Sequence, residues 1–344
     1  MALVKQAARS SAELHRPIFV VGSPRSGTTL VQCILSASPC TFSLPETHFF
    51  SIIRPSLGLA IEDRIQPDQL ERIRALLQQE AHLTFDDTTW AVPRGLWERG
   101  DVSMKQLFVW LIDAHRPADD TRRQLRAVEK TPLHVLHAEQ ISEAFPTAKL
   151  VNVVRHPADV VSSWMAAPFA TSRAVLGYAQ AWVQAIESAE SYAKLHSDRI
   201  RTIQHERLVK EPERSVREVC EFLDLPYDNR MLLEFGQEAT RNVARQETWK
   251  DDVQKGVLLN REGVWRGRIS PGQAWLVARA TRAQRLRYGY PAGVEISPKS
   301  IASALLREVS ERFKEGCTVM NTFGAARHAI AALKILGEAG SPRK

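Results

Sequence analysis

The sequence contains little cysteine and no long apolar run. Its 344 residues include four cysteines, none in a CxxC arrangement, so neither a disulfide framework nor a zinc site is predicted. No apolar run approaches the roughly 18 residues of a membrane-spanning helix. The N-terminal residues also lack the apolar core of a secretory signal peptide. These absences predict a cytoplasmic protein with no transmembrane segment, whose thiols stay reduced.

The sequence also lacks the signs of a nucleic-acid-binding protein. The net charge is +7, and residues 241–291 alone hold eleven basic and four acidic residues, an excess of seven. Aromatic residues do not alternate with these basic residues in a repeating pattern, and no nucleic-acid module signature occurs. We therefore expect no nucleic-acid partner. Part of this basic segment is expected to face an anionic ligand, and the rest to be solvated surface.

One segment near the N-terminus is the most informative of the chain. Apolar residues 18–21 lead into Gly-Ser-Pro-Arg-Ser-Gly-Thr-Thr at 22–29, two glycines five positions apart followed by two hydroxyl residues. This is the spacing of the nucleotide P-loop, in which backbone N–H groups and a helix N-terminus bind phosphate. The usual lysine after the second glycine is missing, because Thr28 stands there. We expect an anion-binding loop with Arg25 as its cation, rather than an ATPase.

Short apolar runs alternate with longer amphipathic stretches along the chain. This alternation predicts an α/β fold, with a P-loop-like, mainly parallel sheet flanked by helices. We expect a leader at 1–16, a single domain at 17–291 and a helical C-terminal extension at 292–344. The predicted strands are 18–21, 126–129, 150–154 and 200–205. The predicted helices are 27–36, 69–80, 104–114, 133–144, 158–165, 172–194, 212–223, 299–313 and 324–336.

A second group of polar residues follows the predicted strand 150–154. Arg155 stands at the carboxyl end of this strand, where ligands of open α/β sheets bind. A helix is predicted to begin at Pro157, and Ser163 lies two turns along it. The arginine fork suits phosphate, and a serine hydroxyl can donate to the same group. We therefore interpret Arg155 and Ser163 as a second anion-binding site.

Together, these motifs resemble the sulfotransferases that use 3′-phosphoadenosine 5′-phosphosulfate (PAPS), over residues 17–291. The resemblance implies that Arg155 and Ser163, eight positions apart as in that family, hold the 3′-phosphate. The run Gly-Val-Trp-Arg at 263–266 resembles the family element that closes over the nucleotide, which implies binding by Trp265 and Arg266. A further match begins at His205, where many members have tyrosine. The loop residues implied to hold the 5′-phosphosulfate are Arg25, Ser26, Gly27, Thr28 and Thr29.

An arginine in this loop is typical of one branch of the family, which comprises protein-tyrosine and many bacterial sulfotransferases, and the chain resembles that branch. In that branch a glutamate after the first helix is the general base, which implies this role for Glu46. In the same branch, a lysine at the end of a strand lies near the leaving group, and the resemblance implies this position for Lys130. His48 is a rival base at a similar position. A capping or solvated role for Glu46, and a surface position for Lys130, stay open.

The resemblance implies in-line transfer of a sulfuryl group to an acceptor hydroxyl or amine. Glu46 would take the acceptor proton, and Arg25 and Lys130 would stabilise charge on the leaving oxygen. No metal is required, and we interpret His134 and His137 as an ordinary helix face. Two alternatives stay open. They are a P-loop kinase or NTPase, which the missing loop lysine disfavours, and a noncatalytic nucleotide-binding protein on the same fold.

The acceptor is not determined by these motifs. Residues 49–123 and 166–201, between the motifs, are expected to shape its pocket. A small molecule, a glycan or a lipid head group is favoured by the predicted cytoplasmic location, and a peptide tyrosine remains open.

Overall fold

The structure is a computed structural model of the chain. It describes residues 16–86, 89–90, 102–117, 125–168, 170, 172–242, 261–291 and 296–318. The chain divides into two compact units. Unit 1 comprises Met1–Ser23, Gly27–Val154 and Ser188–Asn260, and unit 2 comprises Pro24–Ser26, Arg155–Glu187 and Arg261–Lys344.

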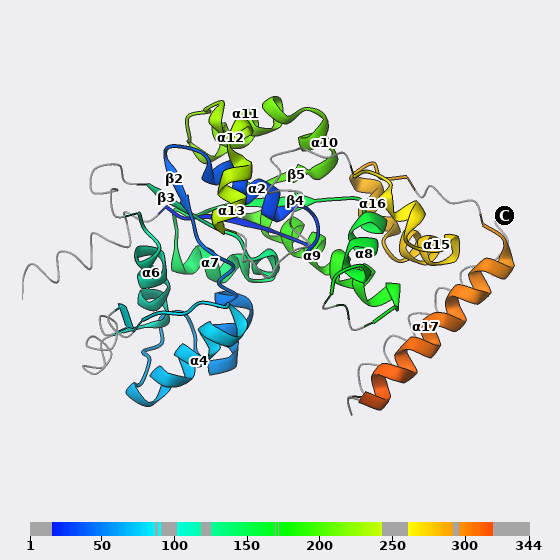
Figure 1. The fold of residues 1–344 in the computed structure, drawn as a ribbon, viewed down its shortest axis with the longest axis horizontal. Helices are drawn as coiled ribbons and strands as arrows, with labels where there is room; N and C mark the ends of the chain where they lie inside the picture. Colours follow the sequence, from blue (N-terminus) through cyan, green and yellow to red (C-terminus); the bar gives the residue numbers. More distant parts are fainter. Residues whose placement is uncertain are drawn as a thin grey trace, which may run out of the picture. The chain divides into compact units, whose positions relative to one another are not determined.

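Unit 1 is built on one five-stranded sheet (Figure 1). Its strands are β1 (Ile18–Gly22), β2 (Thr41–Ser43), β3 (Arg126–Glu129), β4 (Lys149–Val154) and β5 (Ile200–Gln204). They lie in the order β2-β3-β1-β4-β5, and every neighbouring pair is parallel. The order changes direction beside β1, and ligands of such sheets bind at the carboxyl ends of the strands near this point. The predicted fold class is confirmed.

Helices cover both faces of this sheet (Figure 1). Ile18 and Val20 of β1 belong to an apolar cluster on one face. Phe19 points to the opposite face, where its ring stacks on Phe108 with 5.8 Å between centroids. All of β1 is buried, as expected for a parallel strand covered on both sides. The cluster on the first face includes side chains of α2 (Thr28–Ser36), α11 (Pro212–Leu223), α12 (Arg230–Leu233) and α13 (Phe235–Asn242).

Unit 1 contains further helices and helical turns besides those of the first face. The predicted helix 133–144 is a 3-10 turn, η3 (Pro132–His137), followed by α7 (Ala138–Ala144). A π-helical turn, η1 (Phe49–Ile53), was not predicted. The remaining elements are α3 (Arg54–Leu57), η2 (Pro67–Gln69), α4 (Leu70–Glu80), α6 (Met104–Ala114) and α10 (His205–Lys210). Helix α9 (Val175–Leu195) begins among the residues of unit 2 and ends among those of unit 1.

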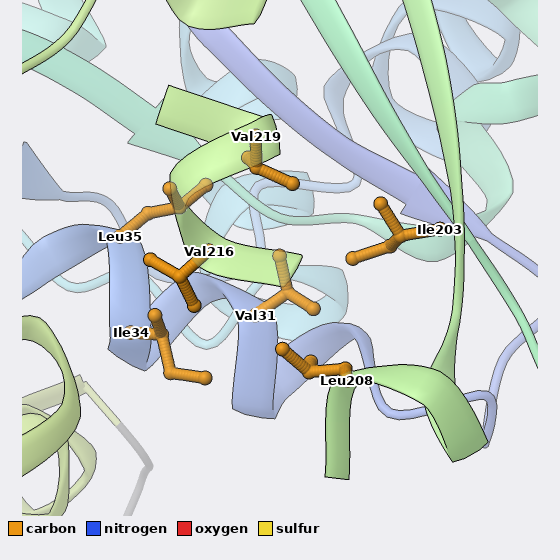
Figure 2. A pocket seen from close by; sticks show the side chains of 7 residues that line it. All are labelled: Val31, Ile34, Leu35, Ile203, Leu208, Val216 and Val219. Atoms are coloured by element: carbon orange, nitrogen blue, oxygen red, sulfur yellow. The ribbon is translucent and has the colours of Figure 1, made fainter. Parts of the chain in front are cut away.

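A small apolar pocket lies where the first helix meets strand β5 and two later helices. Figure 2 shows its side chains pointing toward one another from α2, β5, α10 and α11. No polar side chain lines it, so we interpret it as part of the core rather than as a binding site. The lining residues are Val31, Ile34, Leu35, Ile203, Leu208, Val216 and Val219.

Unit 2 has a separate apolar core made by helices. Its elements are α8 (Pro157–Met165), the first part of α9, η5 (Val264–Gly267), α15 (Pro271–Ala280), α16 (Arg282–Arg287) and α17 (Pro298–Thr318). Helices α15 and α17 meet closely, since a Cβ on Gly272 would lie 2.2 Å from the carbonyl oxygen of Ser300. The buried Glu308 of α17 accepts a hydrogen bond from the backbone N–H of Val175. The extension helix at 299–313 is therefore confirmed and packed into this unit.

The structure leaves some of the predictions about the chain's organisation untested. The helix expected at 324–336 lies outside the described residues. The boundaries at 16/17 and 291/292 remain predictions. Within the described ranges, no helix has both the length and the apolar character needed to cross a bilayer. Cys33, Cys40 and Cys220 are free thiols.

The turn after β1 requires a glycine at position 22. Gly22 has φ 139°, and an added Cβ would lie 2.5 Å from the carbonyl oxygen of Val153. We expect Gly22→Ala to lower the free energy of unfolding by about 2–4 kcal/mol, because backbone strain and steric overlap add.

The matched control is Gly58→Ala. Gly58 has φ 67°, but no described heavy atom lies within 4 Å of an added Cβ. This variant has only the conformational cost of about 1 kcal/mol. Urea unfolding followed by tryptophan fluorescence measures both, and equal losses in the two variants would contradict the steric argument.

Candidate functional site

Residues 23–27 connect β1 to α2, and their first half is held by α8. The indole Nε1 of Trp164 donates to the carbonyl oxygen of Pro24 at 2.9 Å. Arg25 has φ 72°, a conformation that non-glycine residues adopt only where their surroundings impose it. Its Nε donates to Ser163 Oγ at 3.1 Å. The structure therefore brings together two predicted site residues, Arg25 and Ser163, from separate motifs.

The second half of the loop forms the N-terminus of α2. Gly27 has φ 97°, and α2 begins at Thr28 with no acidic residue in its first turn. A Cβ on Gly27 would lie 2.5 Å from Nδ1 of His205, so only glycine fits beside this ring. Among the described residues, no side chain caps this helix, and Ser26 Oγ is buried without a hydrogen-bond partner. Uncapped N–H groups and a buried hydroxyl fit an anionic ligand.

Arg155 directly follows β4 and is anchored within unit 2. Its side chain is buried, and Nη2 donates to the carbonyl oxygen of Arg261 at 3.0 Å. Its own carbonyl accepts from Trp182 Nε1 at 3.0 Å. Arg155 precedes α8, which begins at Pro157, whereas Ser163 lies within that helix. The shared 3′-phosphate role of Arg155 and Ser163 therefore stays a prediction.

Asp159, midway between Arg155 and Ser163, was missed by the sequence analysis. It is 1% exposed, and its two carboxylate oxygens accept the backbone N–H groups of Gly263 at 2.9 Å and Trp265 at 3.0 Å. It therefore fixes the turn η5 on α8. The available signal was its spacing of four from Ser163, which places both on one face of the predicted helix.

The turn held by Asp159 carries the predicted nucleotide contacts Trp265 and Arg266. Trp265 is buried and lies parallel to the ring of His156, with 6.2 Å between centroids. The guanidinium carbon of Arg266 lies 4.7 Å from the Trp265 ring centroid. Burial lowers the pKa of the nearby Arg261, and the charge of Arg268 lowers it further. A bound anion would offset this repulsion between cations.

In unit 1, the ends of β2 and β3 bring Glu46 and Lys130 together. Ser43 lies opposite Val128, and the N–H of Leu44 donates to the carbonyl oxygen of Val128 at 2.9 Å, which extends the pairing. Just beyond, Lys130 Nζ donates to Glu46 Oε1. Lys130 is 1% exposed, so the surface alternative for this residue is wrong. A buried ammonium needs such a partner.

The rival base, His48, lies beside the same carboxylate. Its Nε2 is 3.5 Å from Glu46 Oε2, and both side chains are about one-quarter exposed. His48 has φ 49°, so the chain bends sharply there. The structure thus groups Glu46, His48 and Lys130 but does not by itself choose the base.

His134 is not on an ordinary helix face, so that prediction was wrong. It is 0% exposed, its Nδ1 lies 3.0 Å from Glu129 Oε2, and its Nε2 accepts the N–H of Phe50 at 3.1 Å. Periodicity gave no sign of this environment, because the partner Phe50 lies 84 positions away in the sequence. Nδ1 of His137 lies 3.0 Å from Gln140 Oε1. Across the described ranges, no group of three or more His, Cys, Asp or Glu residues could hold a metal ion.

The predicted site residues therefore fall into two sets, each described within its own unit. The set in unit 2 is Arg25, Ser26, Arg155, Ser163, Trp265 and Arg266, and the set in unit 1 is Gly27, Thr28, Thr29, Glu46 and Lys130.

Fold and site together define a parallel α/β protein with a P-loop-like turn after its first strand. The model of the Sulfotransferase family matches residues 17–229, and the chain belongs to this family. Two solved structures share its fold. The sulfotransferase domain of the Synechococcus PCC 7002 olefin synthase has a TM-score of 0.57 and 21% identity, covering 80% of this chain and 96% of that one. The sulfotransferase domain of the curacin biosynthetic pathway has a TM-score of 0.56 and 18% identity, covering 80% and 98%.

Curated relatives match at the level of sequence. A protein-tyrosine sulfotransferase of Drosophila melanogaster is 28% identical over 264 residues, which is 74% of this chain and 48% of that protein. An uncharacterized protein of Aquifex aeolicus is 27% identical over 258 residues, which is 73% of this chain and 30% of that protein. The chain therefore spans less than half the length of these two relatives. The predicted resemblance to the sulfotransferases is confirmed.

The contacts of Asp159 lead to a prediction for unit 2. In Asp159→Asn one oxygen becomes an NH₂ donor that faces another donor, the N–H of Gly263 or Trp265. We expect a loss of about 1–3 kcal/mol in the free energy of unfolding. Hydrogen exchange at these two amides should accelerate.

The control is Asp228→Asn. Asp228 lies at the surface, where it pairs with the Arg230 side chain at 2.8 Å and accepts the Arg230 N–H at 2.9 Å, contacts that water can replace. Exchange at Gly263 and Trp265 that stays slow in Asp159→Asn would show that the carboxylate does not hold the turn.

Proposed function

We propose that this protein transfers a sulfuryl group from PAPS to an acceptor hydroxyl or amine, with Glu46 as general base. The observation that carries this proposal is the hydrogen bond from Arg25 Nε to Ser163 Oγ. It links the glycine loop to the arginine–serine motif, and this favours one small ligand with several anionic groups over two unrelated sites. Membership of the Sulfotransferase family supports the same chemistry.

The donor would be held by groups already positioned for anions. The N-terminus of α2, with Thr28 and Thr29, has the donors for the 5′-phosphosulfate. Arg155 and Ser163 have the charge and hydroxyl for the 3′-phosphate. Trp265 and Arg266 offer an aromatic face and a cation for the nucleotide. PAPS supplies an electrophilic sulfur and a leaving phosphate, and no metal is part of the proposal.

Glu46 is the proposed general base, which takes the proton from the acceptor. Its carboxylate is partly exposed and accepts a hydrogen bond from Lys130. A carboxylate within hydrogen-bond reach of the acceptor hydroxyl can take its proton. Lys130 also brings a buried positive charge to the strand ends, where it can stabilise a leaving oxygen. Arg25 has the same role from the loop.

The acceptor is proposed to be a small molecule, a glycan or a lipid head group. A peptide tyrosine is the alternative, since the Drosophila relative is named a protein-tyrosine sulfotransferase. The proposed location is the cytoplasm.

Nucleotide binding tests the donor. We expect 3′,5′-adenosine bisphosphate (PAP) to raise the melting temperature more than 5′-AMP or ATP, because a ligand of the native state stabilises it. Arg155→Ala should weaken PAP binding by about 2–4 kcal/mol and Ser163→Ala by about 1 kcal/mol. Equal rises in the melting temperature of the unaltered protein with PAP and with 5′-AMP would contradict the assignment of Arg155 and Ser163 to the 3′-phosphate.

Turnover tests the base. Glu46→Gln keeps the shape but cannot accept the proton, so PAP release should fall about 10²–10⁴-fold with PAP affinity nearly unchanged. His48→Ala should have the smaller effect. The opposite ranking would transfer the base role to His48.

One assay separates the three candidate functions. Labelled PAPS is incubated with 4-nitrophenol, N-acetylglucosamine or a tyrosine peptide, and PAP release is measured beside ATP hydrolysis. PAP release supports the sulfotransferase, ATP hydrolysis alone supports a kinase or NTPase, and PAP binding without turnover supports a noncatalytic nucleotide-binding protein.

A further inference from the structure

Four successive backbone N–H groups after Glu46 donate to one buried cluster at the end of β3. A run of consecutive donors with side-chain acceptors replaces the usual helix cap here, because η1 begins at Phe49 without one. The four bonds are Thr47 N to Glu129 Oε1 at 3.3 Å, His48 N to Thr131 Oγ1 at 3.2 Å, Phe49 N to Thr47 Oγ1 at 3.3 Å and Phe50 N to His134 Nε2 at 3.1 Å.

All of these acceptors converge on Glu129. Its Oε1 accepts the hydroxyls of Thr47 at 2.8 Å and Thr131 at 2.6 Å, and its Oε2 lies 3.0 Å from Nδ1 of His134. Since Nε2 of His134 accepts an amide N–H, the proton of the ring lies on Nδ1 and is donated to Glu129. Each hydroxyl likewise donates to Glu129 and accepts an amide. The direction of every hydrogen bond is thereby set by this one carboxylate.

The carboxylate of Glu129 is 0% exposed. Burial raises its pKa, but the hydrogen bonds of His134, Thr131 and Thr47 together bring that pKa below its ordinary value. An acceptor with several lone pairs is needed here, because an apolar side chain would leave buried donors unsatisfied. The carboxylate of Glu129 is therefore required as a hydrogen-bond acceptor and does not merely fill space.

This network adjoins the ion pair of Glu46 and Lys130 along both chain segments. Glu46 immediately precedes the anchored run 47–50, and Lys130 lies between two members of the network, Glu129 and Thr131. A shift of the anchored backbone would move the carboxylate of Glu46 relative to Lys130. Misplacement of a catalytic group by about 1 Å can cost about 100-fold in rate.

We propose that Glu129 is a positioning residue for sulfuryl transfer, one that fixes the general base through its hydrogen bonds without touching the reactants. This rests on the proposed function. It gives the buried carboxylate, its histidine and its two threonines one common task. The nucleotide-binding residues lie outside this task, so donor binding should be insensitive to it.

The sharpest test removes one hydroxyl from the network. Thr131→Val keeps the shape but loses both the bond to Glu129 and the acceptor for His48 N–H, whereas Thr131→Ser keeps the hydroxyl. We expect Thr131→Val to lower kcat about 10–100-fold, with the KM for PAPS and the PAP affinity within about twofold of the unaltered protein. Thr131→Ser should recover most of kcat. The acceptor is the one of the three probes with the fastest PAP release.

A matched control separates positioning from stability. Thr41→Val removes another buried threonine hydroxyl of unit 1, which donates to the carbonyl oxygen of Leu35 at 2.6 Å and belongs to no part of the network. It should lower the melting temperature without lowering kcat. A similar loss of kcat in both valine variants would overturn the positioning role, since any buried hydroxyl would then suffice.

Hydrogen exchange gives a readout that needs no acceptor. In Thr131→Val the amides of residues 47–50 should exchange faster, with those of β1 unchanged. Faster exchange with unchanged kcat would overturn the positioning role while leaving the proposed function intact. An unaltered protein that neither binds PAP nor releases it from PAPS overturns the proposed function, and the positioning role with it.

Discussion

The parallel pairing of β1 with β3 on one side and β4 on the other is the constraint on which the rest of the structure depends. Parallel strands end at the same edge of the sheet. The residues that directly follow β1, β3 and β4 are the glycine loop, Lys130 and Arg155. Both faces of β1 are covered by helices, which makes its position rigid. The proposed chemistry draws on residues that follow these strands.

Two buried carboxylates have parallel tasks in the two units. Asp159 accepts two backbone N–H groups and holds the turn with Trp265, while Glu129 and its partners accept four and hold the segment after Glu46. In both cases a charge removed from water is stabilised by hydrogen bonds from backbone or neighbouring side chains. Both of these segments are thereby tied to a regular element. Such support is what keeps site residues within a few tenths of an ångström.

Local pattern was sufficient for much of the fold. The strand at 126–129 was predicted with its observed bounds, and three others within one residue. Strands β1 and β4 are nearly continuous apolar runs, as is usual for buried parallel strands. The three-residue β2 and the π-helical turn η1 were not predicted, since such short elements have no periodicity of their own. His134 was misjudged because its environment comes from Glu129, Thr131 and Phe50 together. Hydrogen bonds such as Phe50 to His134, 84 positions apart, leave no local signal.

The sequence by itself determined the motifs, their order and the family: the loop with Arg25, the Arg155–Ser163 pair and the residues Glu46 and Lys130 are all visible as spacing and residue type. Only the tertiary structure decided which of them meet. It buried Lys130 against Glu46, joined Arg25 to Ser163, and recruited Asp159 and Glu129, which no motif singled out. The physical reason is that periodicity encodes which face of an element is buried, whereas a buried polar network depends on strand register and on distant partners chosen by packing.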